Sequence, residues 1–210
     1  MSQTPLSLEP GAILWLLDLA GVAVFAISGA LVAAARRQTL VTFIFFAVVT
    51  GVGGGTARDL FIGAPVFWIE ENRTLLICVG AALLVWCLPA RLWRGQALLW
   101  FDAVGLAAYA TFGAAKGLSY GVAPLPAMAM GVLTACLGGI IRDVLAGEPS
   151  ILMRAELYVT AAALSAAAMV GLLTVGMEPT LAGPIAACGG FALRAGAIVR
   201  GWKLPAYERG

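Results

Sequence analysis

The chain has 210 residues, of which 61% are hydrophobic and 11% are charged. A soluble domain carries about 25% charged residues, so this composition excludes a protein whose whole surface faces water. The net charge is +2 and no long basic tract is present, so we expect no nucleic-acid partner.

The residue types that build metal centres and catalytic sites are scarce. The sequence contains no histidine, and its four cysteines lie in apolar segments without CxxC spacing: Cys78, Cys87, Cys136 and Cys188. Such cysteines are typical of buried thiols, and do not indicate a zinc site or a disulfide framework. Because a histidine base, a nucleophile elbow and a metal cluster are all missing, we expect neither an enzyme nor a cofactor.

Seven apolar segments follow one another, separated by short polar loops. A helix needs roughly 20 residues to cross about 30 Å of hydrocarbon. The segments span residues 12–35, 39–62, 73–90, 97–116, 122–146, 155–177 and 180–200. The first is too long for the apolar region of a signal peptide and has no basic residue before it, so we expect it to be retained. The sequence predicts one all-α transmembrane domain over residues 1–210, with seven transmembrane helices.

The basic residues predict the orientation of these helices. Cytoplasmic loops of membrane proteins carry an excess of Lys and Arg. An outside N-terminus places eight basic residues on the cytoplasmic side: Arg36, Arg37, Arg91, Arg94, Arg154, Arg200, Lys203 and Arg209. It leaves Arg73 and Lys116 outside. We therefore predict an outside N-terminus and a cytoplasmic C-terminus, in what is expected to be a bacterial inner (plasma) membrane.

The sequence repeats itself at an offset of 84 positions. Asp18-Leu-Ala-Gly recurs as Asp102-Ala-Val-Gly, and the pair Arg58-Asp59 recurs as Arg142-Asp143. The first repeat covers about residues 12–90 and the second about 97–177, which leaves a seventh helix over about 180–200. Each repeat has three helices, an odd number, so the second copy enters the membrane from the opposite side. This predicts two inverted three-helix repeats, with the functional path between them.

Each repeat carries the pattern Gly-Gly-x-x-Arg-Asp in its second helix. The glycines are Gly53, Gly54 and Gly55 in the first copy, and Gly138 and Gly139 in the second. Glycine costs about 1 kcal/mol in a helix interior relative to alanine, so consecutive glycines favour a kink or an unwound turn. Freed carbonyls at membrane depth are tolerated along a wet cavity, which would suit a cation. The alternative is that the glycines allow close helix packing.

Six of the charged residues within the apolar segments belong to the repeated motifs: Asp18, Arg58, Asp59, Asp102, Arg142 and Asp143. A charge at the centre of a membrane helix costs about 2.5–3.5 kcal/mol, so such residues usually face a bundle interior or a cavity. Neighbouring residues on a helix point in different directions, so Arg58 and Asp59 are expected to have partners elsewhere. Matching depths suggest that Asp18 pairs with Arg58 and that Asp102 pairs with Arg142. The alternative for Asp18 and Asp102 is a position at the lipid headgroups.

Several other polar residues are candidates for the wall of the path. Lys116 lies near the outer end of its helix, where it either reaches the interface or projects into an outer vestibule and repels cations as a gate. Hydroxyl side chains form the second group: Ser28, Thr50, Thr56, Thr111 and Thr134. The alternative for each hydroxyl is a bond to its own helix backbone.

The paired motifs resemble those of the prokaryotic trimeric intracellular cation (TRIC) channels. The first is GGGTARDL over residues 53–60, followed by PVFW over 65–68, and the second is GGIIRDVL over 138–145, followed by RAELYVT over 154–160. The likeness covers about residues 12–200. It implies a homotrimer with seven helices per subunit, an ion path through each subunit, and potassium as a prominent permeant ion. The long basic tail of the animal branch is missing.

We therefore expect a monovalent cation channel, with potassium ions and membrane lipid, including bound lipid, as its partners. One alternative is a secondary transporter of a small ion or solute, since inverted repeats with broken helices are also typical of alternating-access carriers. A non-transporting scaffold is a further alternative, but it gives the doubled glycine motif no purpose.

Overall fold

The computed structural model describes residues 12–70, 72–93, 96–153 and 156–205. Within these ranges the chain is all-helical. Its elements, in order, are α1 (Ala12–Ala35), α2 (Leu40–Ile62), α3 (Phe67–Glu70), α4 (Asn72–Cys87), η1 (Ala90–Trp93), α5 (Ala97–Ser119), α6 (Pro124–Ala146), η2 (Ile151–Met153), α7 (Val159–Thr174) and α8 (Pro179–Arg200). The positions of Arg94, Arg154 and Arg209, used above for orientation, lie outside the described residues.

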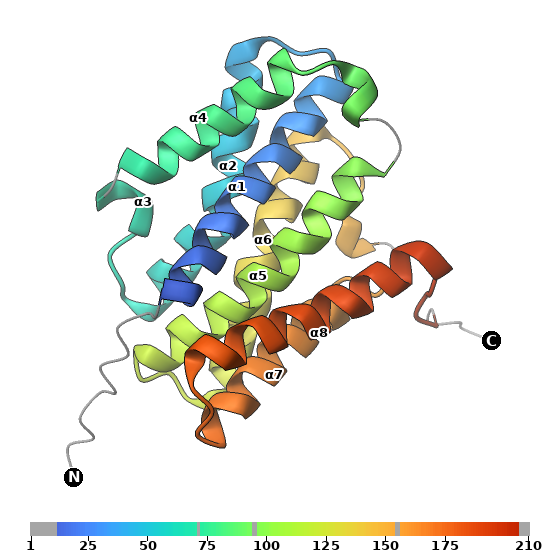
Figure 1. Cartoon of the computed structure of the whole chain (residues 1–210). Coiled ribbons are helices and arrows are strands. Elements are labelled where there is room, and N and C mark those ends of the chain that lie inside the picture. Colours follow the sequence, from blue (N-terminus) through green and yellow to red (C-terminus); the bar gives the residue numbers. More distant parts are fainter. Residues whose placement is uncertain (1–11, 71, 94–95, 154–155, 206–210) are drawn as a thin grey trace.

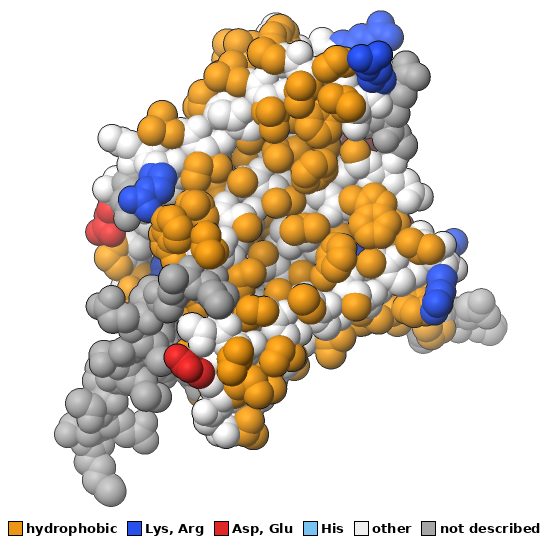
Figure 2. Space-filling model, viewed as in Figure 1, with side chains coloured by type: hydrophobic (Ala, Val, Ile, Leu, Met, Phe, Trp, Pro, Cys, Tyr) orange, Lys and Arg blue, Asp and Glu red, His pale blue; other side chains and the backbone are white. Residues whose placement is uncertain are grey.

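The helices have the lengths and composition of a membrane protein. Among the described residues, α1, α2, α5, α6 and α8 are long and apolar enough to cross a bilayer. The apolar helices α4 and α7 are shorter, at 16 residues each. They end before residues 90 and 177, where the sequence predicted them to end. Pro89 follows α4 and cannot continue a helix, and the turn after α7 contains Gly176 in the left-handed conformation (φ 85°). Figure 2 shows apolar side chains spread over the face of the bundle, with Lys and Arg near its edges.

The elements form two sets of three main helices, α1-α2-α4 and α5-α6-α7, with α8 added at the end. The second helix of each set, α2 or α6, has 23 residues and ends at a left-handed glycine, Gly63 (φ 67°) or Gly147 (φ 66°). This conformation favours glycine because it has no Cβ to collide with the backbone. A short helical turn, α3 or η2, then leads to the third helix.

The two sets pack directly against each other at the centre of the bundle. α1 lies against α2, α4 and α5, while α6 lies against α2, α5 and α7 (Figure 1). Gly21 of α1 makes room for the Tyr109 ring of α5, and Gly105 of α5 makes room for the Phe25 ring of α1. The two rings lie 5.3 Å apart between centroids. Because Gly21 and Gly105, like Phe25 and Tyr109, are 84 positions apart, this is one contact made twice with the roles exchanged.

Helix α8 lies against α5 and α7, on one side of the bundle (Figure 1). It has no counterpart beside the first set of helices among the described residues. The fold therefore combines a nearly symmetric pair of three-helix units with one added helix, and this addition distinguishes the surroundings of the two Arg-Asp motifs.

Candidate permeation site

The glycines of the two motifs bring α2 and α6 into backbone contact. Both helices run without interruption through them, so of the predicted kink or unwound turn, the unwound turn is wrong and the kink stays a prediction. A Cβ at Gly54 would collide with the Thr134 carbonyl oxygen, and a Cβ at Gly138 would lie 2.5 Å from the Thr50 carbonyl oxygen. Gly53 faces the end of the Ile141 side chain. Close packing, the alternative given above, therefore accounts for Gly54 and Gly138.

The remaining motif glycines make room for side chains. A Cβ at Gly55 would lie 2.6 Å from the Phe67 ring, and one at Gly139 would lie 2.9 Å from the Tyr158 hydroxyl. Both aromatic residues belong to segments that follow the motif helix or the turn after it. The glycines thus let these segments fold back against α2 and α6.

Each Arg-Asp pair forms a direct contact between neighbours. Arg58 Nε donates to Asp59 Oδ1 at 2.8 Å, and Arg142 Nε donates to Asp143 Oδ1 at 2.9 Å. The expected partners elsewhere are present for Asp59, which also accepts from Lys116, but the direct contact within each pair was not expected. The other carboxylate oxygen accepts a backbone N–H eight residues later, from Phe67 at 3.1 Å or from Ile151 at 2.9 Å. Each aspartate thus fastens the turn that follows its own helix.

The second charge cluster consists of Asp102, Arg142, Asp143 and Ser28. Arg142 Nη1 donates to Asp102 Oδ1 at 2.7 Å and to the Ser28 hydroxyl at 3.0 Å. Arg142 Nη2 lies 2.8 Å from Asp143 Oδ1. The predicted Asp102–Arg142 pair is confirmed, and both residues are buried within the protein instead of lying at the surface. The serine comes from α1, so this cluster joins the two three-helix units.

The first charge cluster consists of Asp18, Arg58, Asp59 and Lys116. Asp59 Oδ1 accepts from Arg58 and also from Lys116 Nζ of α5, at 2.8 Å. Asp18 Oδ1 and both terminal nitrogens of Arg58 are buried without a hydrogen-bond partner among the described residues. The predicted Asp18–Arg58 pair is therefore wrong. The Arg58 guanidinium carbon instead lies 5.7 Å from the centre of the Phe67 ring and 4.9 Å from that of Phe112, where cation–π attraction replaces part of the lost polar contact.

Most of the predicted wall hydroxyls are bonded to their own helices. Ser28 donates to Phe25 O, and Thr111 and Thr134 donate to the carbonyls four residues earlier. Thr56 donates to Val52 O and accepts from the Trp68 indole N–H. The Thr50 hydroxyl is buried without a partner among the described residues. Thr50 and Thr134 face Gly29 and Gly113, another contact made twice at the offset of 84.

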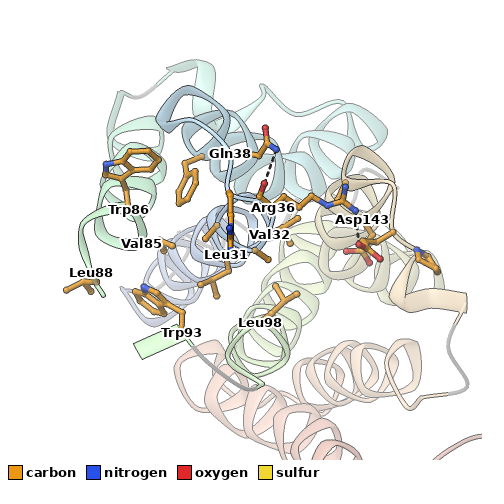
Figure 3. A pocket seen from close by; sticks show the side chains of 17 residues that line it. Leu31, Val32, Arg36, Gln38, Val85, Trp86, Leu88, Trp93, Leu98 and Asp143 are labelled. Carbon is orange, nitrogen blue, oxygen red and sulfur yellow. Dashed lines mark hydrogen bonds and ion pairs between the residues drawn. The ribbon is translucent and has the colours of Figure 1, made fainter. Parts of the chain in front are cut away.

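A cavity of about 900 Å³ opens at the end of the bundle that carries the second charge cluster (Figure 3). Asp143 and Val32 line it, together with the ends of α1, α4 and α5. Arg36 Nη2 and Glu148 Oε1 form an exposed ion pair of 2.7 Å on its wall. Trp86 and Trp93 are also among its lining residues. The described residues hold no group of three or more Cys, Asp or Glu suited to a metal ion.

The position equivalent to Lys116 is Val32, because the two residues are 84 positions apart. At the first cluster the Lys116 ammonium occupies the space beside Asp59, and its side chain is 18% exposed. At the second cluster the apolar Val32 lies on the cavity wall together with Asp143. Both aspartates contact the neighbouring arginine, but Asp59 is also covered by a second cation, Lys116, whereas Asp143 lines an open cavity.

Comparison of the sequence with known proteins shows the family to which this chain belongs. A family model described as a glycine transporter matches residues 15–90 and again residues 99–174. A UPF0126 membrane protein of Vibrio cholerae serotype O1 is 37% identical over 202 residues, which cover 93% of this chain and 83% of that protein. The UPF0126 inner membrane protein YadS of Escherichia coli K12 is 43% identical over 151 residues, 69% of this chain and 72% of that protein. The chain belongs to the UPF0126 family.

Solved structures confirm the resemblance of this UPF0126 protein to TRIC channels. A TRIC trimeric intracellular cation channel orthologue from Rhodobacter sphaeroides is 42% identical, with a TM-score of 0.84, and the match covers 90% of this chain and 99% of that one. A prokaryotic TRIC channel crystallised in 0.5 M KCl is 30% identical, with a TM-score of 0.83, and the match covers 91% of this chain and 98% of that one. The two ranges matched by the family model begin at residues 15 and 99, again 84 positions apart.

Sequence reasoning missed two buried polar residues of this UPF0126 protein, Arg194 and Tyr109. Arg194 lies inside the last apolar segment and is 1% exposed, and its Nη2 lies 2.8 Å from Glu156 Oε2. Tyr109 is fully buried and donates to Gly51 O at 2.8 Å. The rule that identified Arg58 and Arg142, a charge within an apolar segment, would also have found Arg194. Tyr109 gave no such signal, because a tyrosine in a membrane helix is common.

Proposed function

We propose that this protein is a cation channel for monovalent ions, potassium foremost, with the path running between the two three-helix units. The observation that carries the proposal is the unequal treatment of the two aspartates. Asp143 lines a cavity open at one end of the bundle, whereas Lys116 covers Asp59 at the other end at 2.8 Å. An acidic wall attracts cations, and an ammonium group in the path repels them. Lys116 is then the gate.

We also propose that the two units are inverted repeats, so that the chain crosses the membrane seven times. The repeated Gly–aromatic contact between α1 and α5, with exchanged roles, supports a twofold relation between the units. The doubled match of the family model supports the duplication at the same offset. In this arrangement Asp59 and Lys116 lie toward the outside and Asp143 lies toward the cytoplasm.

The same proposal gives the wall of the path. Asp59 and Asp143 are the acidic groups at its two ends, and Thr50, which has a free hydroxyl, lies near the centre where α2 and α6 touch. Gly54 and Gly138 contribute by setting the distance between these helices. Thr56, Thr111 and Thr134 and the Asp102–Arg142 pair then act as supports behind the wall, since their polar atoms are engaged with the protein.

Two further assignments follow from the relatives, and a third follows from the sequence. The R. sphaeroides structure is described as a trimeric channel, so we propose a homotrimer with one path in each subunit. The E. coli relative is described as an inner membrane protein, so we propose that location here. The basic residues place the N-terminus outside and the C-terminus in the cytoplasm.

A second candidate function is a carrier for glycine or a solute of similar size. The family model that matches both units is described as a glycine transporter. A path closed at the Lys116 end and open at the Asp143 end also corresponds to one of the two states that an alternating-access carrier requires. A cavity of about 900 Å³ has room for such a solute.

Reconstitution separates the two functions. The purified protein is placed in a planar bilayer under a potassium gradient, and the same preparation is placed in liposomes with labelled glycine. Discrete current steps that reverse near the potassium equilibrium potential support the channel. Saturable glycine uptake without current steps overturns it and establishes the carrier. Liposomes without protein, and protein carrying Arg142→Gln, serve as controls.

A further inference from the structure

Helix α8 contributes a buried arginine that the internal repeat does not account for. Arg194 is 1% exposed, and its Nη2 lies 2.8 Å from Glu156 Oε2. Its guanidinium carbon lies 5.3 Å from the centre of the Tyr158 ring. A buried charge of this kind is rare in membrane helices unless a partner compensates it. Arg194 therefore fixes both Glu156 and Tyr158 relative to α8.

Glu156 is held a second time by the chain that follows α8. Gly201, in the left-handed conformation at φ 66°, ends the helix and turns the chain back. Lys203 then forms an antiparallel backbone bridge with Glu156. The Trp202 ring closes this turn by packing against Gly196 of α8. Helix α8 therefore binds the Glu156 side chain, and the residues that follow α8 bind the Glu156 backbone.

Tyr158 links Arg194 to the second charge cluster. Its side chain is 1% exposed, and its hydroxyl would lie 2.9 Å from a Cβ placed on Gly139. The same Cβ would lie 3.3 Å from Asp102 Oδ1 and 3.6 Å from Arg142 Nη2. The hydroxyl therefore lies beside the Asp102–Arg142 ion pair, in the space that the absent glycine side chain leaves open.

The first charge cluster lacks this support. The positions equivalent to Glu156 and Tyr158 are Asn72 and Thr74, which have neither a carboxylate nor an aromatic ring. Helix α8 packs on α5 and α7 and has no counterpart against α2 and α4 among the described residues. The two clusters differ in their support as well as in their pairing.

We infer that Arg194 is a positioning residue, which acts through Glu156 and Tyr158 to hold the second charge cluster in one arrangement. The movement that opens the path then takes place at the first charge cluster, where Lys116 meets Asp59. The effect on conduction rests on the proposed channel function, but the positioning itself is measurable without it.

The reactivity of Cys136 measures the positioning directly. Cys136 is buried on α6, one turn before Gly139, and Cys78 is buried on α4. In a Cys87→Ser, Cys188→Ser background, the protein in liposomes is treated with a small maleimide, and modification of each remaining thiol is followed by mass spectrometry. We expect Arg194→Gln and Glu156→Gln each to raise the rate at Cys136 at least about fivefold, with Cys78 unchanged. The double variant should match the single ones, because both remove the same link.

Two further variants keep this test decisive. Val199→Ala changes an α8 side chain that is 71% exposed and has no part in this link, and it should leave Cys136 as slow as before. The Tyr158 hydroxyl has no hydrogen-bond partner among the described residues, so its link to Arg194 runs through the ring. Tyr158→Leu removes this ring and should raise the Cys136 rate even if Arg194→Gln fails to fold. Equal Cys136 rates in the background protein and in folded Tyr158→Leu, Arg194→Gln and Glu156→Gln would overturn the inference. So would an equal rise at Cys78, which indicates general loosening.

Single-channel recording then tests the consequence for conduction. Arg194→Gln should change the unitary current at least about twofold and leave the voltage dependence of opening unaltered, because the gate at Lys116 is untouched. A shifted voltage dependence with an unchanged unitary current overturns the assignment of the movement to the first cluster. A silent bilayer with the unsubstituted protein counts against the channel proposal alone, because the Cys136 result does not depend on current.

Discussion

The two Arg-Asp motifs are similar in sequence, but their arginines differ in the number of hydrogen bonds and ion pairs that they form. In the second charge cluster, Arg142 contacts Asp102, Asp143 and Ser28 at distances between 2.7 and 3.0 Å. In the first, Arg58 makes one hydrogen bond, to Asp59, and its two terminal nitrogens are buried without a partner among the described residues. Unpaired buried polar groups cost about 1–3 kcal/mol each, and more when charged. Asp102 Oδ2 in the second cluster also lacks a partner among the described residues, but Arg58 leaves two nitrogens of a charged group unpartnered, so the first cluster is the less stable of the two.

In the proposed channel, this difference would let one end of the path open while the other end stays fixed. If both charge clusters had the same ion pairs, both ends of the path would be equally rigid and neither end would move more readily than the other. One lysine on α5, with valine at the equivalent position of α1, makes one end closable. The added helix α8 braces the other end. The predictions below test this contrast, beginning with the largest expected effect.

Removal of the charge on Asp102 should damage the fold far more than the same change at Asp18. Asp102→Asn leaves Arg142 without its shortest ion pair, and breaking a buried pair costs about 3–5 kcal/mol. Asp18 forms no ion pair with Arg58, so Asp18→Asn should cost about 1 kcal/mol or less. Unfolding by SDS titration in mixed micelles, followed by circular dichroism, compares the two variants. Equal losses would contradict the contrast between the clusters.

The contact between α2 and α6 should be equally sensitive at its two equivalent glycines, unlike the two charge clusters. Gly54→Ala and Gly138→Ala each place a methyl group against a backbone carbonyl that has no room to move, which should cost about 2–3 kcal/mol. Gly80→Ala on α4 meets no atom within 4 Å and should be neutral or stabilising by about 1 kcal/mol, as expected for alanine in a helix. The same SDS titration measures all three variants. A tolerated Gly54→Ala would mean that the helices are not held at this distance.

Substitutions at Lys116 and at its equivalent, Val32, should change conduction in opposite directions. Lys116→Gln removes the cation from Asp59 and should raise the open probability about tenfold, which corresponds to about 1.4 kcal/mol. Val32→Lys places a cation within reach of Asp143 and should lower the unitary current carried from the cavity side. Val32→Met, of similar length without charge, is the control. Lysine and methionine variants with the same current would show that charge at this position does not control the path.

The sequence predicted those contacts of the site that follow from the repeat and from the depth of each residue in its helix. The offset of 84 residues paired Asp102 correctly with Arg142, because equivalent depths in neighbouring helices bring such residues together. It failed for Asp18 and Arg58, although the spacing is the same. There, Lys116 and the rings of Phe67 and Phe112 compete for the same groups. Those competitors come from other segments, and no local pattern indicates their distance.

The glycine motifs show a second limit. Two or three glycines in a membrane helix are compatible with a break or with close packing, and propensity alone does not decide between them. The carbonyl that faces Gly54 comes from Thr134, which is 80 positions away, so the choice depends on tertiary contact. Helices α4 and α7 were also predicted too long, since apolar residues continue into the loops beyond Cys87 and Thr174. Apolar character marks contact with lipid or protein, and does not by itself mark the end of a helix.

The smallest expected effect comes from a position where the two units differ in backbone strain. Arg37 follows α1 in the left-handed conformation at φ 52°, the one such non-glycine residue described, while its equivalent after α5 is Gly121 at φ 78°. A side chain in this conformation costs roughly 1 kcal/mol, because its Cβ crowds the backbone. Arg37→Gly should therefore raise the free energy of unfolding by up to about 1 kcal/mol, reduced by the greater freedom of glycine in the unfolded chain. Arg37→Ala, which keeps the strain and removes the charge, separates the backbone effect from that of the guanidinium. If Arg37→Gly and Arg37→Ala have the same stability, the strain contributes nothing, and the side chain of Arg37 accounts for the difference between the two units at this turn.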